Sequence, residues 1–167
     1  MSWFLNIDTA VKTASVCLAK DEESIGIKIN TSQNDHASWL QPSIALLLSE
    51  NNVSIEELDA IAVSAGPGSY TGLRVGMATA KGLCFALNKP LILISTLKMM
   101  AAGVLSETSS LICPMIDARR MEVFTAVYNH SLDAILKPHN HILSPDSFNE
   151  ILEQNIVVFF GNGSDKF

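Results

Sequence analysis

Short apolar runs separated by polar turns open the chain. The runs Ser2–Asp8 and Ala14–Lys20 have the length and composition of strands, and an acidic turn follows the second one. Isoleucines at 25, 27 and 29 then alternate with Gly26, Lys28 and Asn30, a period of two that is typical of a half-exposed strand. Three strands joined by short turns predict an antiparallel meander.

Helical and uninterrupted apolar segments alternate over the next part of the chain. Leucines and isoleucine fall on one face of a predicted helix over about residues 35–50, in which Pro42 should introduce a kink or delay the start. This order of elements predicts an α/β fold with a mixed sheet and helices on its faces. The later elements are a buried strand over Ala60–Ser64, a helix over about Thr71–Leu87, a buried strand over Leu91–Ile94 and a helix over Thr96–Glu107.

The same pattern begins again near residue 111, which suggests a duplicated lobe. An apolar run ends on Asp117 at a turn, as the first strand ends on Asp8, and Glu122–Tyr128 is the predicted return strand. Ser144 followed by Pro145 predicts a helix that begins there and runs to about residue 155. A buried strand is expected after it.

This organisation divides the sequence into two predicted domains. The N-terminal lobe covers residues 1–105, and a partial second lobe covers residues 106–167. A second lobe built like the first would need more helix to cover its sheet. We therefore expect that the C-terminal part of this lobe is missing from the sequence.

Composition narrows the class of protein. Of the 167 residues, 48% are hydrophobic and only 17% are charged, whereas roughly a quarter is usual in a soluble domain. So much apolar material excludes disorder, and a net charge of −6 argues against a protein that binds nucleic acid by itself. The low charge implies either that the chain buries much of its own surface or that some apolar surface belongs to a partner.

The cysteines and the lengths of the apolar runs indicate the cellular compartment in which the protein is expected. Cys17, Cys84 and Cys113 are widely spaced and lack the paired spacing of disulfides or zinc sites, so we expect free thiols in a reducing compartment. No segment has the roughly 18 uncharged apolar residues of a membrane span, and the first apolar run is too short for an export signal. We expect a cytoplasmic protein.

A glycine-rich loop between a predicted strand and a predicted helix is the most informative segment. It contains Gly66 and Gly68, and free N–H groups at such a helix start suit anions. Neither common phosphate motif fits, because Thr71 stands where the third glycine is required and no Gly-Lys-Ser/Thr follows. A phosphate site is therefore the least favoured interpretation.

The helix after this loop has a face of small residues. They recur every four positions, and a charged stripe accompanies them. Such a face lets another helix approach closely, so a partner helix and an internal contact are equally open interpretations. The small residues are Gly72, Gly76, Ala80 and Cys84, and the charged residues are Arg74 and Lys81.

Two strand-end carboxylates, Asp8 and Asp117, are further candidates for chemistry. In two-lobed nucleotide-binding folds, paired hairpins hold phosphate and metal between the lobes, and Thr9, Gly66 and Gly68 would complete a degenerate nucleotide cleft here. Hairpins that grip phosphate need glycine, which the turns after both carboxylates lack. Because aspartate is also a common turn former, we favour an architectural role, with nucleotide binding as the minority alternative.

The histidines predict neither a metal site nor a catalytic triad. The position four after His36 is Leu40, so the first helix carries no H-x-x-x-H pair. His139 and His141 lie beside Pro138 without a nearby Cys, Asp or Glu, and we interpret this segment as a surface loop. No G-x-S-x-G motif is present. We expect no catalytic residue, no metal and no resident cofactor.

Several segments carry a resemblance to a known family. They are Ser64–Gly76 with Ala80–Leu83, Leu5–Thr9, His36–Ile44, and Ile116–Arg119 with Glu122 and Val123. These segments resemble the bacterial TsaB (YeaZ) family of tRNA threonylcarbamoyladenosine biosynthesis proteins, historically grouped with the M22 glycoproteases. The resemblance implies the actin/Hsp70-like ATPase (ASKHA) fold, with two lobes each built on a ribonuclease-H-like core. Met121 departs from the family, which often has glycine there.

The resemblance implies a role in attaching a threonylcarbamoyl group to the adenosine beside the tRNA anticodon. The family works with a catalytic paralogue, TsaD, and an ATPase, TsaE, and tRNA is expected to be contacted only through the complex. The paralogue holds metal with a histidine pair where this chain has His36 and Leu40, so a non-catalytic member is expected. The alternative is an enzyme in its own right, an ATPase or a glycoprotease-like metallopeptidase, with ATP or ADP at an inter-subunit or degenerate cleft.

The resemblance also bears on the small-residue face. Family members pair through helices of the first lobe, as homodimers or with the paralogue, which favours the partner-helix interpretation. The interface residues expected on this basis are Gly72, Gly76, Ala80, Arg74, Lys81, His36 and Leu40.

Overall fold

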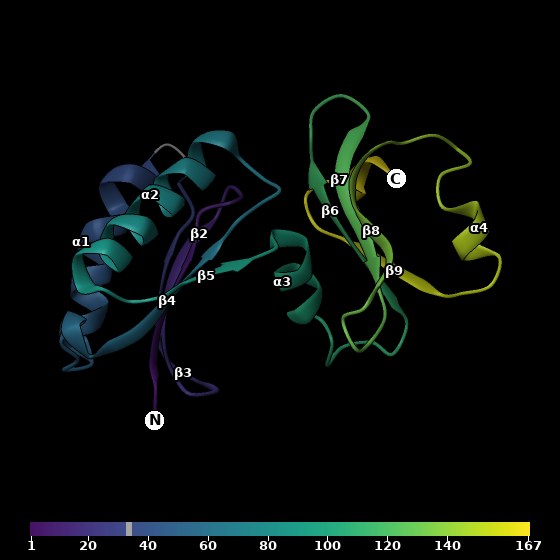
Figure 1. Cartoon of the computed structure of the whole chain (residues 1–167). Coiled ribbons are helices and arrows are strands. Elements are labelled where there is room, and N and C mark those ends of the chain that lie inside the picture. Colours follow the sequence, from purple (N-terminus) through teal and green to yellow (C-terminus); the bar gives the residue numbers. More distant parts are fainter. Residues whose placement is uncertain (33–34) are drawn as a thin grey trace. The chain divides into compact units, whose positions relative to one another are not determined.

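The computed structural model describes residues 1–32 and 35–167, and it divides into two compact units, Met1–Ile94 and Ser95–Phe167 (Figure 1). The division falls after the last strand of the first unit rather than after residue 105, because helix α3 packs on strands of the second unit. The first unit contains β1 (Trp3–Asp8), β2 (Ala14–Lys20), β3 (Glu23–Asn30), α1 (His36–Glu50), the short 3-10 turn η2 (Ile55–Glu57), β4 (Leu58–Ser64), α2 (Tyr70–Leu87) and β5 (Leu91–Ile94). The second unit contains α3 (Thr96–Ala102), β6 (Leu111–Asp117), β7 (Glu122–Tyr128), β8 (Ala134–Ile142), α4 (Asn149–Leu152), β9 (Val157–Phe160) and the 3-10 turn η3 (Ser164–Lys166).

The first unit is a five-stranded sheet with both long helices on one face. Its strands run in the order β3-β2-β1-β4-β5, antiparallel among the first three strands and parallel from β1 to β5. One core cluster joins Leu5 and Val16 of the sheet to Leu40 of α1 and Ala80 of α2, and Figure 1 shows the two helices together beside the sheet. The predicted meander and mixed sheet are therefore confirmed, and α1 continues through Pro42.

Strand β3 shows the predicted alternation, but its isoleucines lie on the uncovered face of the sheet. Gly26, Lys28 and Asn30 face α1 instead. Lys28 Nζ lies 2.6 Å from Glu50 Oε2, and a Cβ at Gly26 would lie 3.0 Å from the Leu47 side chain. The three isoleucines are between 37% and 58% exposed. Because α1 packs so closely over this edge strand, the larger apolar side chains face outward.

Strand β5 differs from the expectation. Its four apolar residues predicted a buried strand, whereas β5 lies at the edge of the sheet and Ile92, Leu93 and Ile94 are exposed. Leu91 alone of the four packs against the core cluster. An apolar run is typical of a central strand, but it does not encode how many neighbours the strand has.

The second unit repeats the strand order of the first. Its sheet runs β8-β7-β6-β9, antiparallel from β8 to β6 and parallel between β6 and β9, which matches β3-β2-β1-β4. Its core includes Cys113, Met115, Val123 and Phe148. The duplication suggested by the sequence pattern is therefore present in the topology.

Three expectations for the second unit are wrong. Helix α3 ends at Ala102 rather than near Glu107. Residues 134–142, which include the segment interpreted as a surface loop, form strand β8. Helix α4 begins at Asn149 rather than at Ser144, because Phe148 adopts a left-handed φ of 65° directly before it and interrupts helical geometry.

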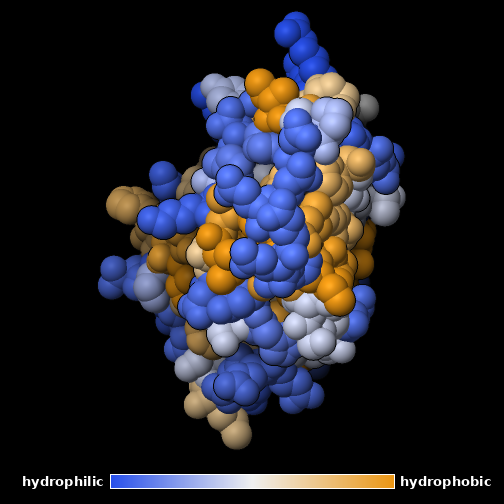
Figure 2. Space-filling model, turned by 90° about the vertical axis from the view of Figure 1, so that its right-hand side faces the viewer, coloured by the Kyte–Doolittle hydropathy of each residue, from blue (hydrophilic) through white to orange (hydrophobic). Residues whose placement is uncertain are grey.

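Apolar side chains remain at the surface of the second unit. Figure 2 views the side that carries α4, and hydrophobic residues lie there on both sides of a hydrophilic band. Ile142, Leu152 and Ile156 are among the exposed large apolar residues of this unit. Over the described part of the chain, none of the helices combines the length and the apolar character needed to cross a membrane.

The glycine-rich loop of the first unit lies directly against the β1–β2 turn. The Ser69 N–H donates to the Ala10 carbonyl oxygen at 2.6 Å, and the Thr9 hydroxyl donates to the Gly72 carbonyl oxygen at 2.7 Å. A Cβ at Gly68 would lie 2.2 Å from the Ala10 carbonyl oxygen. Glycine is therefore required here by the close approach of two backbone segments of the same unit.

The small-residue face of α2 continues this contact toward the sheet. A Cβ at Gly72 would lie 2.0 Å from the Thr9 carbonyl oxygen, a Cβ at Gly76 would lie 2.4 Å from Thr9 Oγ1, and Ala80 is fully buried. The expectation that Gly72, Gly76 and Ala80 form a partner interface is therefore wrong, and the internal contact is the one they serve. A four-residue spacing identifies a face of a helix but not the neighbour on which that face packs.

Gly72→Ala should destabilise the chain by about 2 kcal/mol or more, because the added methyl group overlaps the Thr9 carbonyl oxygen. Gly82→Ala is the matched control on the same helix. Nothing lies within 4 Å of its Cβ position, so it should stabilise the chain by about 0.5–1 kcal/mol through helix propensity. Urea denaturation measures both changes, and equal effects of the two substitutions would contradict the packing of Gly72.

Candidate functional site

The outward face of α2 carries a second set of small residues beside an unpartnered aromatic ring. Ala78, Gly82 and Ala86 recur every four residues on this face and are exposed. Phe85 is 92% exposed, and nothing lies within 4 Å of the Cβ position of Gly82. Glycine inside a helix costs roughly 0.5–1 kcal/mol relative to alanine, and no contact among the described residues requires it at this position.

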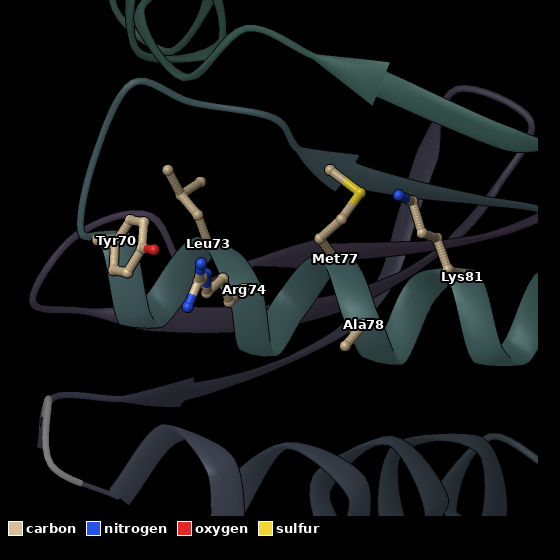
Figure 3. Close-up of a pocket in the computed structure, with 6 residues that line it drawn as sticks. All are labelled: Tyr70, Leu73, Arg74, Met77, Ala78 and Lys81. Carbon is tan, nitrogen blue, oxygen red and sulfur yellow. The ribbon is translucent and has the colours of Figure 1, made fainter.

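A groove runs along α2 next to this face (Figure 3). Leu73, Met77 and Lys81 project from one edge of the helix. Arg74 lies beside Tyr70, with its guanidinium carbon 3.9 Å from the ring centroid. The residues that line the groove are Tyr70, Leu73, Arg74, Met77, Ala78 and Lys81.

Two of the seven expected interface residues, Arg74 and Lys81, lie on this outward surface. Sequence reasoning missed Met77, Gly82 and Phe85. A signal for this face was present, because Ala78, Gly82 and Ala86 repeat the four-residue spacing of the inner face, two residues further along the helix. Periodicity alone ranks the two faces equally, so only packing separates them.

His36 and Leu40, also expected at the interface, are buried near the start of α1. His36 Nε2 lies 3.3 Å from the Val11 carbonyl oxygen, and its Nδ1 lies 3.3 Å from Asn30 Nδ2. Leu40 is fully buried in the core cluster. The expectation for these two residues is wrong, because their side chains fix α1 to the sheet and to the β1–β2 turn.

The residues expected in a nucleotide cleft of the first unit have polar atoms engaged within that unit. Asp8 Oδ1 accepts the Ala10 N–H at 3.0 Å, and Thr9 is fully buried with its hydroxyl bonded to the start of α2. The Cβ position of Gly68 meets the same turn, whereas that of Gly66, which has a φ of 107°, does not. These bonds are those that an architectural role predicts.

Asp117 is the last residue of β6 in the second unit, and its hydrogen-bond partners differ from those of Asp8. Its carboxylate pairs with Lys166 Nζ and accepts the Arg119 N–H at 2.6 Å, while its own N–H donates to Asn162 Oδ1 at 3.1 Å. The Lys166 hydrogen bond is the main cause that lowers the pKa of Asp117 below its ordinary value. Sequence reasoning missed Lys166, since it lies 49 positions away.

His139 and His141 are neighbours on β8, with ring centroids 5.5 Å apart. His139 Nδ1 lies 2.9 Å from the Lys137 carbonyl oxygen, and His141 Nε2 lies 2.9 Å from Ser147 Oγ. Burial first, and then the charge of His139, lowers the pKa of His141. Within residues 1–32 and 35–167, no group of three or more His, Cys, Asp or Glu side chains is placed to hold a metal ion.

Lys166→Met should raise the pKa of Asp117 toward its ordinary value, because the main hydrogen bond to the carboxylate is lost. Since the folded pKa is lowered, Asp117 contributes stability above the unfolded value of about 3.8, and this contribution is lost as pH falls through the folded pKa. The variant should therefore lose stability near neutral pH but little in strong acid.

Carboxyl-carbon NMR titration of Asp117 measures this shift, and denaturation at the two pH values measures its consequence. Lys137→Met, which removes an exposed lysine of the same unit, is the control and should leave the Asp117 pKa unchanged. An unchanged Asp117 pKa in the Lys166→Met variant would show that the ion pair does not hold the carboxylate.

The chain is similar to one described protein family and to several curated proteins. Residues 15–143 match the family described as TsaD, tRNA N6-adenosine threonylcarbamoyltransferase. The chain is 31% identical over 159 residues to the tRNA threonylcarbamoyladenosine biosynthesis protein TsaB of Bacillus subtilis, covering 93% of this chain and 69% of that protein. The chain is also 31% identical to TsaB of Escherichia coli, and the match covers 90% of this chain and 66% of that protein. The chain therefore spans about two thirds of the length of these relatives.

Solved structures agree with this match. A Pseudomonas aeruginosa protein with similarity to peptidase YEAZ aligns with a TM-score of 0.77 at 31% identity, covering 88% of this chain and 68% of that one. YeaZ from the same organism aligns with a TM-score of 0.77 at 24% identity, covering 99% and 89%. The fold is the expected actin/Hsp70-like ATPase fold. The chain belongs to the TsaB (YeaZ) family, whose Bacillus subtilis and Escherichia coli members are named tRNA threonylcarbamoyladenosine biosynthesis proteins.

Proposed function

We propose that this chain takes part in tRNA threonylcarbamoyladenosine biosynthesis as a non-catalytic subunit that pairs with a catalytic paralogue of the TsaD type. Family membership supports the involvement in this biosynthesis, since the relatives from Bacillus subtilis and Escherichia coli carry that name. In this proposal the chain works in the cytoplasm and reaches TsaE and tRNA through the assembled complex.

The unpartnered outward face of α2 is the observation that carries the proposal. Full burial of a phenylalanine side chain stabilises an association by about 1.5–3 kcal/mol, so the 92% exposed ring of Phe85 suits an interface anchor. Gly82 beside it leaves room for a second helix, whose axis would lie roughly 8–10 Å away. Neither residue serves a contact within the described part of the chain, and both suit a partner helix.

Helix α1 lies beside α2 and also carries an exposed apolar residue. Leu46 of α1 is half exposed, and Gln41 Nε2 lies 3.5 Å from Thr79 Oγ1 where the two helices meet. Two neighbouring helices with apolar outward residues offer a broader surface than α2 alone. Such a surface suits the packing of one helix pair against another.

The polar side chains at the strand ends are bonded to other groups of their own unit, which supports a non-catalytic role. Asp8 accepts an N–H of its own turn, the Thr9 hydroxyl is buried, and Asp117 pairs with Lys166. Each of these groups therefore already has a partner within its own unit.

Phe85→Asp and Gly82→Leu should each prevent co-purification of the tagged chain with the TsaD paralogue of the same organism. The first substitution removes the apolar anchor, and the second fills the space into which a partner helix would pack. Ile156→Asp is the control, since Ile156 is a 78% exposed apolar residue of the second unit. Thermal denaturation checks that each variant is folded. Wild-type binding by both α2 variants would show that this face is not the interface.

Calorimetry with ATP and Mg²⁺ tests the non-catalytic part of the proposal separately. We expect no tight binding that depends on Asp8, because its carboxylate is engaged with the β1–β2 turn. Tight binding of ATP that disappears in a folded Asp8→Ala variant would favour the ATPase alternative.

A further inference from the structure

Two histidines lie side by side on the edge strand β8. In the antiparallel pairing of β7 with β8, His139 lies opposite Thr125 and His141 lies opposite Val123, so both imidazoles belong to one face of the sheet. Their ring centroids are 5.5 Å apart in a T-shaped arrangement. A loop, which the sequence pattern predicted here, would give the two side chains no fixed relation, whereas the observed strand brings them together.

Contacts within the second unit hold both rings in place. His139 Nδ1 lies 2.9 Å from the Lys137 carbonyl oxygen, and His141 Nε2 lies 2.9 Å from Ser147 Oγ. The Phe148 ring packs against that of His141, with a centroid distance of 4.9 Å. Both histidines are half-buried. The pair is therefore pre-organised, and little side-chain entropy is lost when both rings bind one ligand.

These hydrogen bonds leave one nitrogen of each ring available. A carbonyl oxygen only accepts, so neutral His139 carries its proton on Nδ1 and keeps a lone pair on Nε2. Ser147 Oγ accepts the Ser144 N–H at 2.9 Å and has a second lone pair for His141 Nε2–H, which leaves the lone pair of His141 on Nδ1. Neither of the two remaining nitrogens has a hydrogen-bond partner among residues 1–32 and 35–167. A hydrogen bond from the second ring nitrogen, commonly to a backbone carbonyl, is the usual support of a metal-binding histidine.

The spacing of the rings fits a single metal ion. Imidazole nitrogen binds Zn²⁺ at about 2.0–2.1 Å, so two imidazoles on one tetrahedral ion have ring centroids roughly 5 Å apart. Small side-chain rotations bring the observed 5.5 Å to that value. The surrounding charge also favours a cation, because residues 133–153, which include both histidines and α4, contain four carboxylates and one lysine.

We propose that His139 and His141 form a two-histidine site for a divalent transition-metal ion of the Zn²⁺ and Cu²⁺ class. Nε2 of His139 and Nδ1 of His141 bind the ion, and water completes its coordination. Imidazole suits such ions, whereas Mg²⁺ and Ca²⁺ prefer oxygen ligands. Two protein ligands are fewer than the four of a structural zinc site, so the ion is exchangeable and folding does not depend on it. The site lies in the second unit and is independent of the docking role proposed above.

Isothermal titration calorimetry of the full chain, purified without a histidine tag, tests the site with Zn²⁺ as the probe. We expect one Zn²⁺ per chain, tighter binding of Cu²⁺, and no binding of Mg²⁺ under the same conditions. His139→Gln and His141→Gln should each weaken Zn²⁺ binding by about 100-fold or more, because the remaining ring binds the ion without the help of the second.

Matched variants separate this site from other histidines and from effects on folding. His130→Gln removes an exposed histidine of the same unit and should leave the Zn²⁺ affinity unchanged. Ser147→Ala keeps both ligands but removes the partner of His141 Nε2, so it should weaken Zn²⁺ binding about tenfold. Circular dichroism confirms that each variant is folded.

Long-range ¹H–¹⁵N NMR of the wild-type chain identifies the nitrogens that bind the ion. Zn²⁺ should shift Nε2 of His139 and Nδ1 of His141, and it should leave the ring nitrogens of His130 unchanged. Equal Zn²⁺ affinity of wild type, His139→Gln and His141→Gln would show an adventitious ion only and overturn the inference. Coordination through the two hydrogen-bonded nitrogens, Nδ1 of His139 and Nε2 of His141, would overturn it as well.

Discussion

The contact between the glycine-rich loop and the β1–β2 turn is the constraint on which the first unit depends. Two backbone segments meet there through the Ala10 carbonyl oxygen, which accepts the Ser69 N–H, and through the Thr9 hydroxyl, which bonds to Gly72. A Cβ at Gly68 or Gly72 would lie near 2 Å from a carbonyl oxygen of the turn. Because α2 begins at this contact, the approach of the two backbones also decides which face of α2 points toward the sheet.

In this orientation, α2 has two faces that carry small residues, one toward the sheet and one toward solvent. The small residues of the two faces have different surroundings. On the inner face, Gly72 and Gly76 leave room for Thr9. On the outer face, Gly82 has open space around it and Phe85 extends into solvent, so no contact within the described chain accounts for either. The inner face therefore contributes to the stability of the first unit. The outer face is the surface on which, in the proposed function, the partner subunit packs.

The same contact bears on the chemistry of the fold. A glycine loop at a helix start is suited to anions, but here it packs on a neighbouring turn whose polar atoms are already bonded. The strand-end Asp117 of the second unit is likewise held, by Lys166. The fold thus combines strand-end carboxylates that are bonded within their own units with an outer helix that exposes Phe85. This combination supports the proposed role as a subunit that works through association.

Local patterns in the sequence determined the elements up to residue 87, because strand alternation, helical periodicity and turn residues all act over a few positions. They also determined the duplicated order of strands and the family. The pattern did not determine that the isoleucines of β3 face outward, that β5 lies at an edge, or that a left-handed Phe148 delays α4. Each of these depends on which distant segment packs alongside.

The candidate site shows the same division between local and tertiary information. From the sequence alone, a stripe of small residues and the two cations Arg74 and Lys81 on α2 could be predicted. Only the tertiary structure decided that Gly76 packs on the sheet while Gly82 remains open, and that Lys166 reaches Asp117. The physical reason is that spacing along a helix specifies faces, whereas the neighbour that each face meets is set by backbone contacts between segments far apart in the chain.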